Sequence, residues 1–375
     1  MMKILFLVTE DWYFLSHRLP LAIAAKKIGY DVHVACRDSG RSDEIKNQGL
    51  KFHKLINKRG YSSPVNILGS VKEIKSIIKI VNPSILHAVS IQGVVLGFLA
   101  TLFNKKIKVI AAITGLGSIF LAKSYKGKIL KSIIGFFLFI NLKKKNITVI
   151  VQNKDDKLFV ANTLKCNKKR IFIVRGSGIN LDYYKVYKQP KYPPINITYV
   201  GRIIKDKGIE EIIKAFNIAK LNISNIKLLL AGSFDTNNFS KLNQEYFLKE
   251  IKNNKQIEYL GELKEVRSLW KKTHIAILAS EREGLPKSLL EAAAMGKAII
   301  ASDVAGCREI AINGINALTF KKGNIEELAK AIIYLATHHE IREIYGFNSR
   351  KLVESDMSED MVIKKTLSIY QTLVF

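Results

Sequence analysis

Two glutamates, Glu283 and Glu291, lie on either side of a Gly-Leu-Pro segment at 284–286. Pro286 suits the first position of a helix, because its φ is already helical and the N–H that it lacks would have no intrahelical partner. We therefore predict a helix from Pro286, with Glu283 in the preceding loop and Glu291 more than one turn inside. First-turn amides favour an anion, and the two carboxylates could accept hydrogen bonds from two sets of hydroxyls. The alternative is an acid near a helix start and a solvated helical residue.

Two cations lie in the segment Gly-Arg-x4-Lys-Gly at 201–208. Gly201 lets the backbone turn tightly where a strand ends. Arg202 and Lys207 would then lie at the carboxyl end of a parallel sheet, the edge at which such folds bind ligands. A guanidinium fork together with a lysine point charge suits a diphosphate group. The alternative is a loop with surface charges.

The elements that must position these residues follow from an alternation of short β-branched runs with helical patterns. Several runs are apolar throughout, as expected for strands that are covered on both faces. The alternation predicts an α/β fold of doubly wound parallel sheets with right-handed crossovers. The predicted strands span 4–8, 31–36, 52–56, 85–89, 108–114, 148–152, 171–174, 197–200, 227–231, 257–260, 275–279, 298–301 and 317–320. The predicted helices include 20–28, 68–81, 209–219, 266–272, 286–295, 308–312 and 325–338.

A polar, tyrosine-rich segment at 181–194 with three prolines interrupts this alternation and suggests an interdomain linker. We predict an N-terminal Rossmann-like domain over 1–180 and a C-terminal Rossmann-like domain over 181–355. A last helix at about 356–375 is expected to pack back on the first domain. The natural ligand site of two facing α/β domains is the cleft between them.

Positive charge is concentrated in the first half of the chain. The 375 residues carry a formal net charge of +28, from 60 Lys and Arg against 32 Asp and Glu, and residues 1–180 contribute +22 of it. Between Glu73 and Asp155 there are 13 lysines and no acidic residue. A field of one sign attracts anionic surfaces such as nucleic acid or anionic lipid. The alternative is a lysine-rich composition spread over solvated faces, which does not account for the missing acids.

The apolar segment 132–142 has lysines at both ends, at 126, 128 and 131 and at 143–145. It is about half as long as the roughly 20 residues that a membrane-spanning helix needs. Phe136, Phe137 and Phe139 between basic flanks suit a helix that lies in a bilayer interface. A buried core helix with lysine ends is the equal alternative.

Cysteine usage and the N-terminal residues both indicate a cytoplasmic protein. Cys36, Cys166 and Cys307 are far apart and show neither zinc nor disulfide spacing, which fits a reducing compartment. Glu10 and Asp11 follow the first apolar run too early for a secretory signal.

The order Gly-Arg-x4-Lys-Gly, then Glu-x7-Glu, resembles the retaining, nucleotide-sugar-dependent glycosyltransferases of the GT-B fold, in their fourth sequence family. The resemblance covers nearly the whole chain. Ile-Thr-Gly-Leu-Gly-Ser at 113–118, Val-Gln-Asn-Lys-Asp-Asp at 151–156 and Arg-Gly-Ser-Gly-Ile-Asn at 175–180 are similar to a bacterial branch of that family. The branch extends sugars on polyprenyl-diphosphate carriers for O-antigen, capsule or N-glycan precursors, and includes the N-acetylgalactosaminyltransferases of the bacterial N-glycan pathway.

The resemblance implies roles for the two motifs. Arg202 and Lys207 would bind the donor diphosphate, Glu283 would hold hydroxyls of the donor sugar, and Glu291 would hold the ribose hydroxyls. The other implied donor contacts are Gly201, Gly284, Leu285, Pro286, Ser288 and Leu289.

The N-terminal domain departs from the family pattern in two places. Many relatives have a Gly-Gly pair in the first loop, which here reads Thr-Glu-Asp-Trp-Tyr at 9–13, and a histidine where this chain has Gly115. This leaves His17, just before a predicted helix, as the N-terminal candidate at the reaction centre. A helix-cap or packing histidine is the alternative. His87, at the end of a strand, is expected to be a satisfied buried histidine.

Arg202, Lys207 and the helix amides can stabilise the charge that grows on a departing diphosphate. No Asp-x-Asp motif is apparent, so we expect metal-independent transfer without a cofactor. The resemblance implies retention of configuration, with the leaving phosphate taking the acceptor proton.

The sequence therefore predicts a retaining transferase that moves a hexose or N-acetylhexosamine from a UDP-sugar to a polyprenyl-diphosphate-linked sugar. We expect it on the inner face of the bacterial cytoplasmic membrane, attached peripherally through its basic N-terminal domain. The alternatives are a UDP-sugar 2-epimerase of the same fold, a basic nucleic-acid-binding protein and a catalytically idle sugar-binding regulator. Nucleic acid is not expected as a partner, because no helix-turn-helix, RNA-recognition or zinc motif is present.

Overall fold

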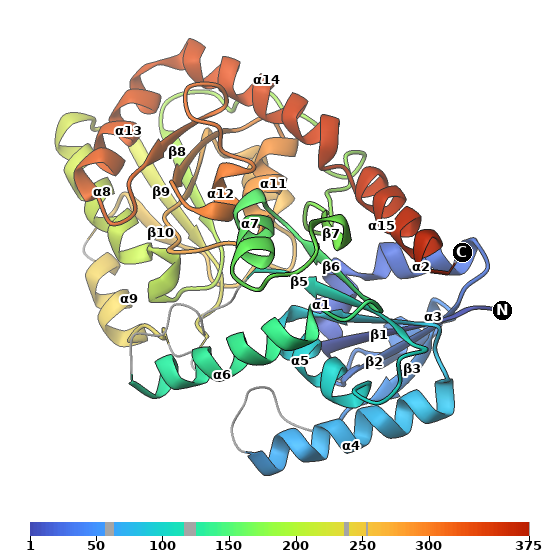
Figure 1. Cartoon of the computed structure of the whole chain (residues 1–375). Helices are drawn as coiled ribbons and strands as arrows, with labels where there is room; N and C mark the ends of the chain where they lie inside the picture. The colour runs from blue at the N-terminus through green and yellow to red at the C-terminus, as the bar shows by residue number, and fades with distance from the viewer. Residues whose placement is uncertain (57–63, 116–124, 236–239, 253, 375) are drawn as a thin grey trace. The chain divides into compact units, whose positions relative to one another are not determined.

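The chain folds into two compact units (Figure 1). The computed structural model describes residues 1–375 apart from 57–63, 116–124, 236–239, 253 and 375. Unit 1 comprises Met1–Ser177 and Glu359–Phe375, and unit 2 comprises Gly178–Ser358. The last helix thus belongs to unit 1, although it follows unit 2 in the sequence.

Unit 1 is built on a seven-stranded parallel sheet in the order β3-β2-β1-β4-β5-β6-β7. The strand order reverses between β1 and β4, which is the topological switch point of such a sheet. The strands are β1 (Lys3–Glu10), β2 (Asp31–Arg37), β3 (Lys51–Lys54), β4 (Ile85–Val89), β5 (Lys108–Ile113), β6 (Ile147–Val151) and β7 (Ile171–Ile173).

The apolar strand runs are explained by burial on both faces of this sheet. Along β1, Leu5 and Leu7 enter the hydrophobic core on one face, whereas Ile4, Phe6 and Val8 enter the core on the other. Successive side chains of a strand point to opposite faces, so a strand that is covered twice must be apolar at every position.

The helices of unit 1 cover both faces of the sheet (Figure 1). Residues of α4, α5, α6 and α7 contribute to one core, and residues of α2 and α15 to the other, where Tyr370 of α15 is fully buried. The helices are α1 (Asp11–His17), α2 (Leu19–Lys27), α3 (Ser42–Asn47), α4 (Pro64–Val81), α5 (Ser90–Ala100), α6 (Tyr125–Asn141), α7 (Lys154–Asn162), η2 (Lys168–Arg170) and α15 (Glu359–Val374).

Unit 2 repeats the plan with a six-stranded parallel sheet in the order β10-β9-β8-β11-β12-β13. Its switch point lies between β8 and β11. The strands are β8 (Ile195–Val200), β9 (Ile226–Ala231), β10 (Ile257–Tyr259), β11 (Ile275–Leu278), β12 (Ala298–Ser302) and β13 (Ala317–Phe320). The helices are η3 (Lys205–Lys207), α8 (Ile209–Asn222), α9 (Gln244–Lys252), α10 (Arg267–Lys271), α11 (Lys287–Ala294), α12 (Ala305–Arg308), α13 (Ile325–Thr337) and α14 (His339–Asp356).

The prediction of two doubly wound parallel sheets is confirmed, and every predicted strand is present with its ends shifted by no more than two residues. One predicted helix, at 308–312, is wrong, because the helix there is α12, which ends at Arg308. Asn316 explains the difference. Its side chain accepts from the Ile312 amide at 2.8 Å and donates to the Ile310 carbonyl at 2.8 Å, which replaces helical hydrogen bonds.

The sequence also left out α1, a short helix directly after β1. Its first residue, Asp11, is fully buried and accepts hydrogen bonds from the amides of Ser39 at 2.7 Å and Arg41 at 3.1 Å. These partners lie about 30 residues away, so a tertiary contact rather than a local pattern holds the start of this helix.

Candidate functional site

The two motifs with predicted chemistry follow the two central strands of unit 2. Gly201 and Arg202 come directly after β8, and the loop 279–286 comes after β11. These strands are neighbours in the sheet and flank its switch point. In open parallel sheets, ligands bind outside the carboxyl ends of the strands at this position.

Lys207, Ser280 and Glu283 form one hydrogen-bonded cluster at this edge. The Lys207 ammonium donates to Oε1 of Glu283, and the Ser280 hydroxyl donates to the same oxygen at 2.6 Å. The side chains of Lys207 and Glu283 are 20% and 11% exposed, so this ion pair is largely shielded from water. The glutamate is therefore held by two donors beside a cation.

A glycine lets the lysine reach this position. Gly208, which ends η3, has a left-handed backbone with φ +68°, and a Cβ there would overlap the carbonyl of Ala279. Glycine has no Cβ and adopts this conformation without strain. The motif Lys-Gly thus brings η3 against the end of β11, where Ser280 begins the loop.

Arg202 lies at the same sheet edge with a different partner. Its Nη1 donates to Oδ2 of Asp235 at 2.6 Å, and its side chain is 46% exposed. Its backbone is anchored, because the buried hydroxyl of Tyr199 donates to the Arg202 carbonyl at 2.7 Å. A Cβ at Gly201 would lie 2.9 Å from that hydroxyl, so glycine keeps the anchor intact. The guanidinium therefore projects from a fixed turn.

The helix after the loop begins one residue later than predicted. Pro286 has extended backbone, φ −73° and ψ 115°, and is the residue before α11 rather than its first residue. The amides of the first turn, around Ser288 and Leu289, have no intrahelical acceptor in such a position. Leu289 is 1% exposed, so its side chain belongs to the core and only its backbone can face a ligand.

Gly284 in the middle of this loop is held by a close backbone contact. A Cβ at Gly306 of α12 would overlap the carbonyl of Gly284. The glycine of α12 therefore allows that helix to support the loop that carries Glu283 and Leu285.

Glu291 is buried, which excludes the alternative of a solvated helical residue. It is 6% exposed and accepts from the Tyr184 hydroxyl at 3.1 Å and from the Trp270 indole N–H at 3.3 Å, one on each carboxylate oxygen. Burial raises the pKa of Glu291 above its ordinary value, and these two donors act in the opposite direction. The predicted ribose contact is thus a carboxylate in a low-dielectric site with a fixed orientation.

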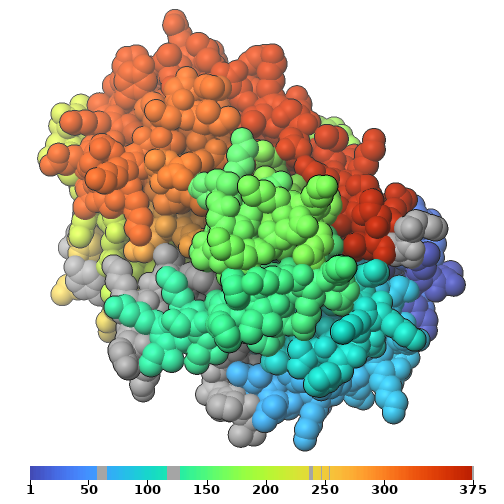
Figure 2. Space-filling model, viewed as in Figure 1, coloured from blue at the N-terminus to red at the C-terminus, as the bar shows by residue number. Residues whose placement is uncertain are grey.

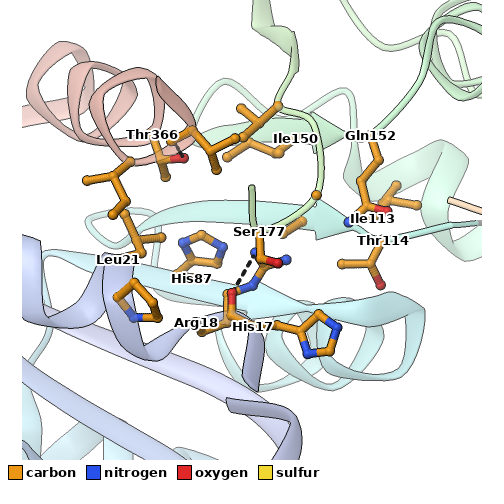
Figure 3. A pocket seen from close by; sticks show the side chains of 16 residues that line it. His17, Arg18, Leu21, His87, Ile113, Thr114, Ile150, Gln152, Ser177 and Thr366 are labelled. Atoms are coloured by element: carbon orange, nitrogen blue, oxygen red, sulfur yellow. Dashed lines mark hydrogen bonds between the residues drawn. The ribbon is translucent and has the colours of Figure 1, made fainter. Parts of the chain in front are cut away.

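His17 lies in unit 1 as the last residue of α1. Its ring stacks on Tyr13 with centroids 4.3 Å apart, and its Nδ1 is 2.6 Å from the Ser16 hydroxyl. It lines a pocket together with Arg18, His87 and Gln152 (Figure 3). Of the motif 113–118, residues 116–118 lie outside the described part of the chain.

His87 only partly meets the prediction of a satisfied buried histidine. It is 2% exposed, and its Nδ1 lies 2.6 Å from the hydroxyl of Tyr370, but its Nε2 has no hydrogen-bond partner among the described residues. Burial holds the pKa of His87 well below its usual range.

Helix α6 has both the buried and the exposed side that the sequence left as alternatives. Phe137 and Phe139 pack against the core of unit 1, as the alternative of a buried core helix requires. Phe136 is 66% exposed and Ile133 is 61% exposed, and both project outward with Ile129 and Ile140. In Figure 2 this helix, coloured blue-green, lies open at the surface of its unit. These four residues are called the α6 apolar stripe below.

Several residues of these sites were not predicted from the sequence. Ser280 and Asp235 hold the predicted Glu283 and Arg202, and Tyr184 and Trp270 hold Glu291. Tyr184 lies in the tyrosine-rich segment 181–194, which the sequence suggests is a linker. The abundance of tyrosine in this segment is the one feature of the sequence that could have indicated a hydrogen-bond donor for Glu291. The others are isolated polar or aromatic residues whose proximity depends on the fold.

Two family models match successive parts of the chain. Residues 3–155 match a "Glycosyl transferase 4-like" model, and residues 187–352 match the "Glycosyl transferases group 1" model. An uncharacterized glycosyltransferase of Methanocaldococcus jannaschii is 30% identical over 296 residues, which are 76% of this chain and 73% of that protein. The chain belongs to the group 1 glycosyltransferases.

This glycosyltransferase is similar along almost its whole length to two further proteins. N,N'-diacetylbacillosaminyl-diphospho-undecaprenol alpha-1,3-N-acetylgalactosaminyltransferase of Campylobacter jejuni is 24% identical, over 96% of this chain and 98% of that protein. The solved structure of Anabaena HepE in complex with UDP and glucose superposes with a TM-score of 0.79 at 14% identity, covering 99% of this chain and 100% of that one. The enzyme thus has the GT-B fold. Within the described ranges, its helices are all too short or too polar to cross a bilayer.

Proposed function

We propose that this glycosyltransferase is a retaining enzyme that transfers a hexose or N-acetylhexosamine from a UDP-sugar to a polyprenyl-diphosphate-linked sugar. The single observation that carries the proposal is the cluster of Lys207, Glu283 and Ser280 at the switch point of unit 2. A cation and an oriented carboxylate beside a helix start suit a sugar joined to a diphosphate. The UDP complex of Anabaena HepE supports the choice of UDP.

The proposed donor site uses each group for a different part of the nucleotide sugar. Lys207 and Arg202 bind the diphosphate, Glu283 accepts from hydroxyls of the sugar, and the backbone from Gly284 to Leu289 completes the contacts. Glu291, buried between Tyr184 and Trp270, accepts from the ribose hydroxyls. Lys207 and Glu283 are paired with each other in the structure, so donor binding exchanges one ion pair for two ligand contacts.

The proposed reaction breaks the bond between the anomeric carbon and the diphosphate oxygen. A bond from the acceptor hydroxyl oxygen to the same carbon forms on the face that the diphosphate leaves, and the acceptor proton passes to a leaving phosphate oxygen. Negative charge on the diphosphate increases along this path, so Lys207 and Arg202 stabilise the transition state more than the bound donor. These two cations supply positive charge at the leaving group without a cofactor.

The acceptor class and membrane attachment rest on separate support. The Campylobacter relative is named for an undecaprenol-diphosphate acceptor, and such a lipid lies in a membrane. Unit 1 is the basic unit, and the α6 apolar stripe ends beside three consecutive lysines, of which Lys143 and Lys145 are exposed. Apolar side chains between cations suit an anionic bilayer surface. We infer peripheral attachment to the inner face of the bacterial cytoplasmic membrane through unit 1.

The first test is substitution of the cluster residues. Lys207→Ala and Glu283→Gln are each expected to lower kcat for transfer to a short polyprenyl-diphosphate sugar by about 10²–10³. Lys207 stabilises the charge on the leaving diphosphate, and Glu283 holds the sugar in the reactive position. Lys205→Ala is the matched control, because Lys205 lies in the same η3 turn with an exposed side chain. Wild-type rates in folded Lys207→Ala and Glu283→Gln would refute the site.

The same assay separates the rival reactions. The anomeric configuration and linkage of the product are read by NMR, and inverted configuration would refute retention. Incubation with the UDP-sugar alone is expected to leave the sugar unepimerised. Formation of a C2 epimer without acceptor would instead establish the epimerase.

A further inference from the structure

Arg18 of unit 1 is a buried cation that none of the described carboxylates pairs with. It lies at the junction of α1 and α2, is 7% exposed, and forms no ion pair with any carboxylate that the structure describes. Among the described residues, the guanidinium makes one long hydrogen bond, from Nη1 to the His17 carbonyl at 3.4 Å, and its Nε has no hydrogen-bond partner. The guanidinium therefore lies largely out of water, and none of the described carboxylates is paired with it.

A ring nitrogen of His87 at the same pocket also has no partner among the residues that the structure describes. His87 of β4 is 2% exposed, and its Nε2 makes no hydrogen bond to the described part of the chain. Figure 3 shows His87 and Arg18 at the same pocket, which Ser177 also lines. Buried polar atoms in native proteins nearly always have partners, so two unpartnered atoms in one pocket point to a missing ligand.

The pocket lies where parallel sheets bind ligands. Arg18 comes after β1, His87 lies on β4, and the switch point of the unit 1 sheet falls between these two strands. Thr114, Gln152 and Ser177 come after β5, β6 and β7 and also line the pocket. Its polar wall is therefore assembled from the carboxyl ends of successive strands.

The rest of the pocket wall is apolar, which strengthens the electrostatic effect of the Arg18 charge. Leu21 of α2, Ile150 of β6 and Val362 of α15 line the pocket and are each no more than 6% exposed. Low-dielectric walls concentrate the field of a charge inside a pocket. An anionic group that binds in this pocket would therefore interact with the Arg18 guanidinium with little screening by water.

We propose that this pocket binds a phosphoryl group of the acceptor, with Arg18 as the charge partner and Gln152 and His87 as hydrogen-bonding partners. A planar guanidinium with a free Nε matches the paired oxygens of a phosphate. The assignment rests on the proposed function, because it takes the phosphate to be that of the lipid-linked diphosphate sugar. It adds an anion site in unit 1 to the donor diphosphate site of unit 2.

The first experiment measures anion binding without catalysis. Inorganic pyrophosphate is titrated by calorimetry into the full chain carrying Lys207→Ala, which weakens the donor site. Adding Arg18→Gln is expected to lower the remaining affinity at least tenfold. Arg41→Gln, which removes an exposed arginine of the same unit paired with Glu44, is the control and is expected to leave the affinity unchanged. Unchanged affinity in Arg18→Gln overturns the proposal.

Thermal unfolding separates a binding role from a structural one. Without an anion, Arg18→Gln is expected to melt at the same temperature as wild type or higher, because the substitution removes an uncompensated buried charge. In the Lys207→Ala background, pyrophosphate is expected to raise the melting temperature of the chain that keeps Arg18 and not that of the chain with Arg18→Gln. A lower melting temperature combined with unchanged pyrophosphate affinity identifies Arg18 as structural and overturns the proposal. If Arg18→Gln does not fold, Gln152→Ala is tested in its place. Unchanged pyrophosphate affinity in Gln152→Ala would also overturn the proposal.

Kinetics then identify the source of the phosphate. With a polyprenyl-diphosphate sugar as acceptor, Arg18→Gln is expected to raise the acceptor KM at least tenfold and to change the donor KM much less. Loss of pyrophosphate binding without a change in acceptor KM would mean that the pocket takes a free anion, which overturns the assignment to the acceptor. If the enzyme shows no transfer at all, the proposed function is wrong. The pyrophosphate titration still tests whether the Arg18 pocket binds an anion.

Discussion

The two glutamates of the motif occupy environments that suit different tasks. Glu283 lies at the rim of the site, where it pairs with the Lys207 ammonium and accepts a hydrogen bond from Ser280. Glu291 is buried and owes its orientation to Tyr184 and Trp270. A buried carboxylate is a good acceptor for neutral hydroxyls. Burial also makes it take up a proton more readily than an exposed glutamate, an effect that the charge of Lys287 and the two hydrogen-bond donors reduce.

This difference predicts a pH effect of Tyr184. Ribose hydroxyls need the ionised form of Glu291, so donor affinity should fall as the pH falls through its raised pKa. Tyr184→Phe removes a hydrogen bond that lowers this pKa, and the pKa should then rise further. The acid limb of kcat/KM for the donor is expected to move to higher pH, and the donor KM to increase about fivefold, the equivalent of about 1 kcal/mol.

The neighbouring tyrosine provides the control for this prediction. Tyr183 is 41% exposed, and its hydroxyl contacts Glu265 at 3.5 Å rather than Glu291. Tyr183→Phe should leave the pH profile unchanged. Equal profiles for Tyr184→Phe and wild type would show that Glu291 does not govern donor binding.

At the scale of elements, short backbone segments and single helix faces decide what the residues can do. The turn η3 and the loop before α11 meet because glycine at 208 tolerates the contact with Ala279, and α12 supports that loop through Gly306. In unit 1, α6 divides its apolar residues between the core and the outer surface. A helix with a core side and an apolar outer stripe needs a partner for that stripe, and exposed lysines at its end favour anionic lipid.

The α6 apolar stripe leads to a prediction about vesicle binding. Phe136→Ser is expected to weaken binding to anionic vesicles about tenfold, because a phenylalanine contributes roughly 1.5–3 kcal/mol when it leaves water. Sedimentation or flotation with vesicles of mixed anionic and neutral lipid measures the effect. Phe347→Ser in α14 of unit 2 is the matched control, since Phe347 is 60% exposed and lies beside Lys351. Equal losses in both variants would count against α6 as the docking element.

At the scale of the whole molecule, the charge is unevenly divided between the units. Residues 1–180 account for +22 of the net charge of +28, and the segment added by α15 contains as many acidic as basic residues. Attraction to an anionic surface therefore acts mainly on unit 1. Such attraction acts at a distance but is screened over about 10 Å at 0.1 M salt, whereas apolar insertion is not.

The uneven charge predicts a two-part salt dependence. Binding of the wild type to anionic vesicles should fall steeply between about 0.05 and 0.2 M NaCl and then level off at a residual value that Phe136→Ser removes. Neutral vesicles should bind only at that residual level. Equal binding to neutral and anionic vesicles at low salt would contradict the electrostatic part of the account.

The sequence by itself determined the architecture. Continuous apolar runs separated by helical patterns are possible only if each strand is covered on both faces, so the strands and the doubly wound class could be predicted from local patterns. The motif residues could be placed at strand ends for the same reason. Even the start of α11 was off by one residue, because the backbone of Pro286 is set by the loop that precedes it.

Only the tertiary structure decided which side chains meet. The pairing of Lys207 with Glu283, the burial of Glu291 between Tyr184 and Trp270, and the division of α6 into two faces each join residues that are distant in the sequence or depend on what a helix packs against. That no described carboxylate pairs with Arg18 could not be predicted either. Whether a buried charge has a partner is a property of everything that surrounds it, and local sequence does not contain that information.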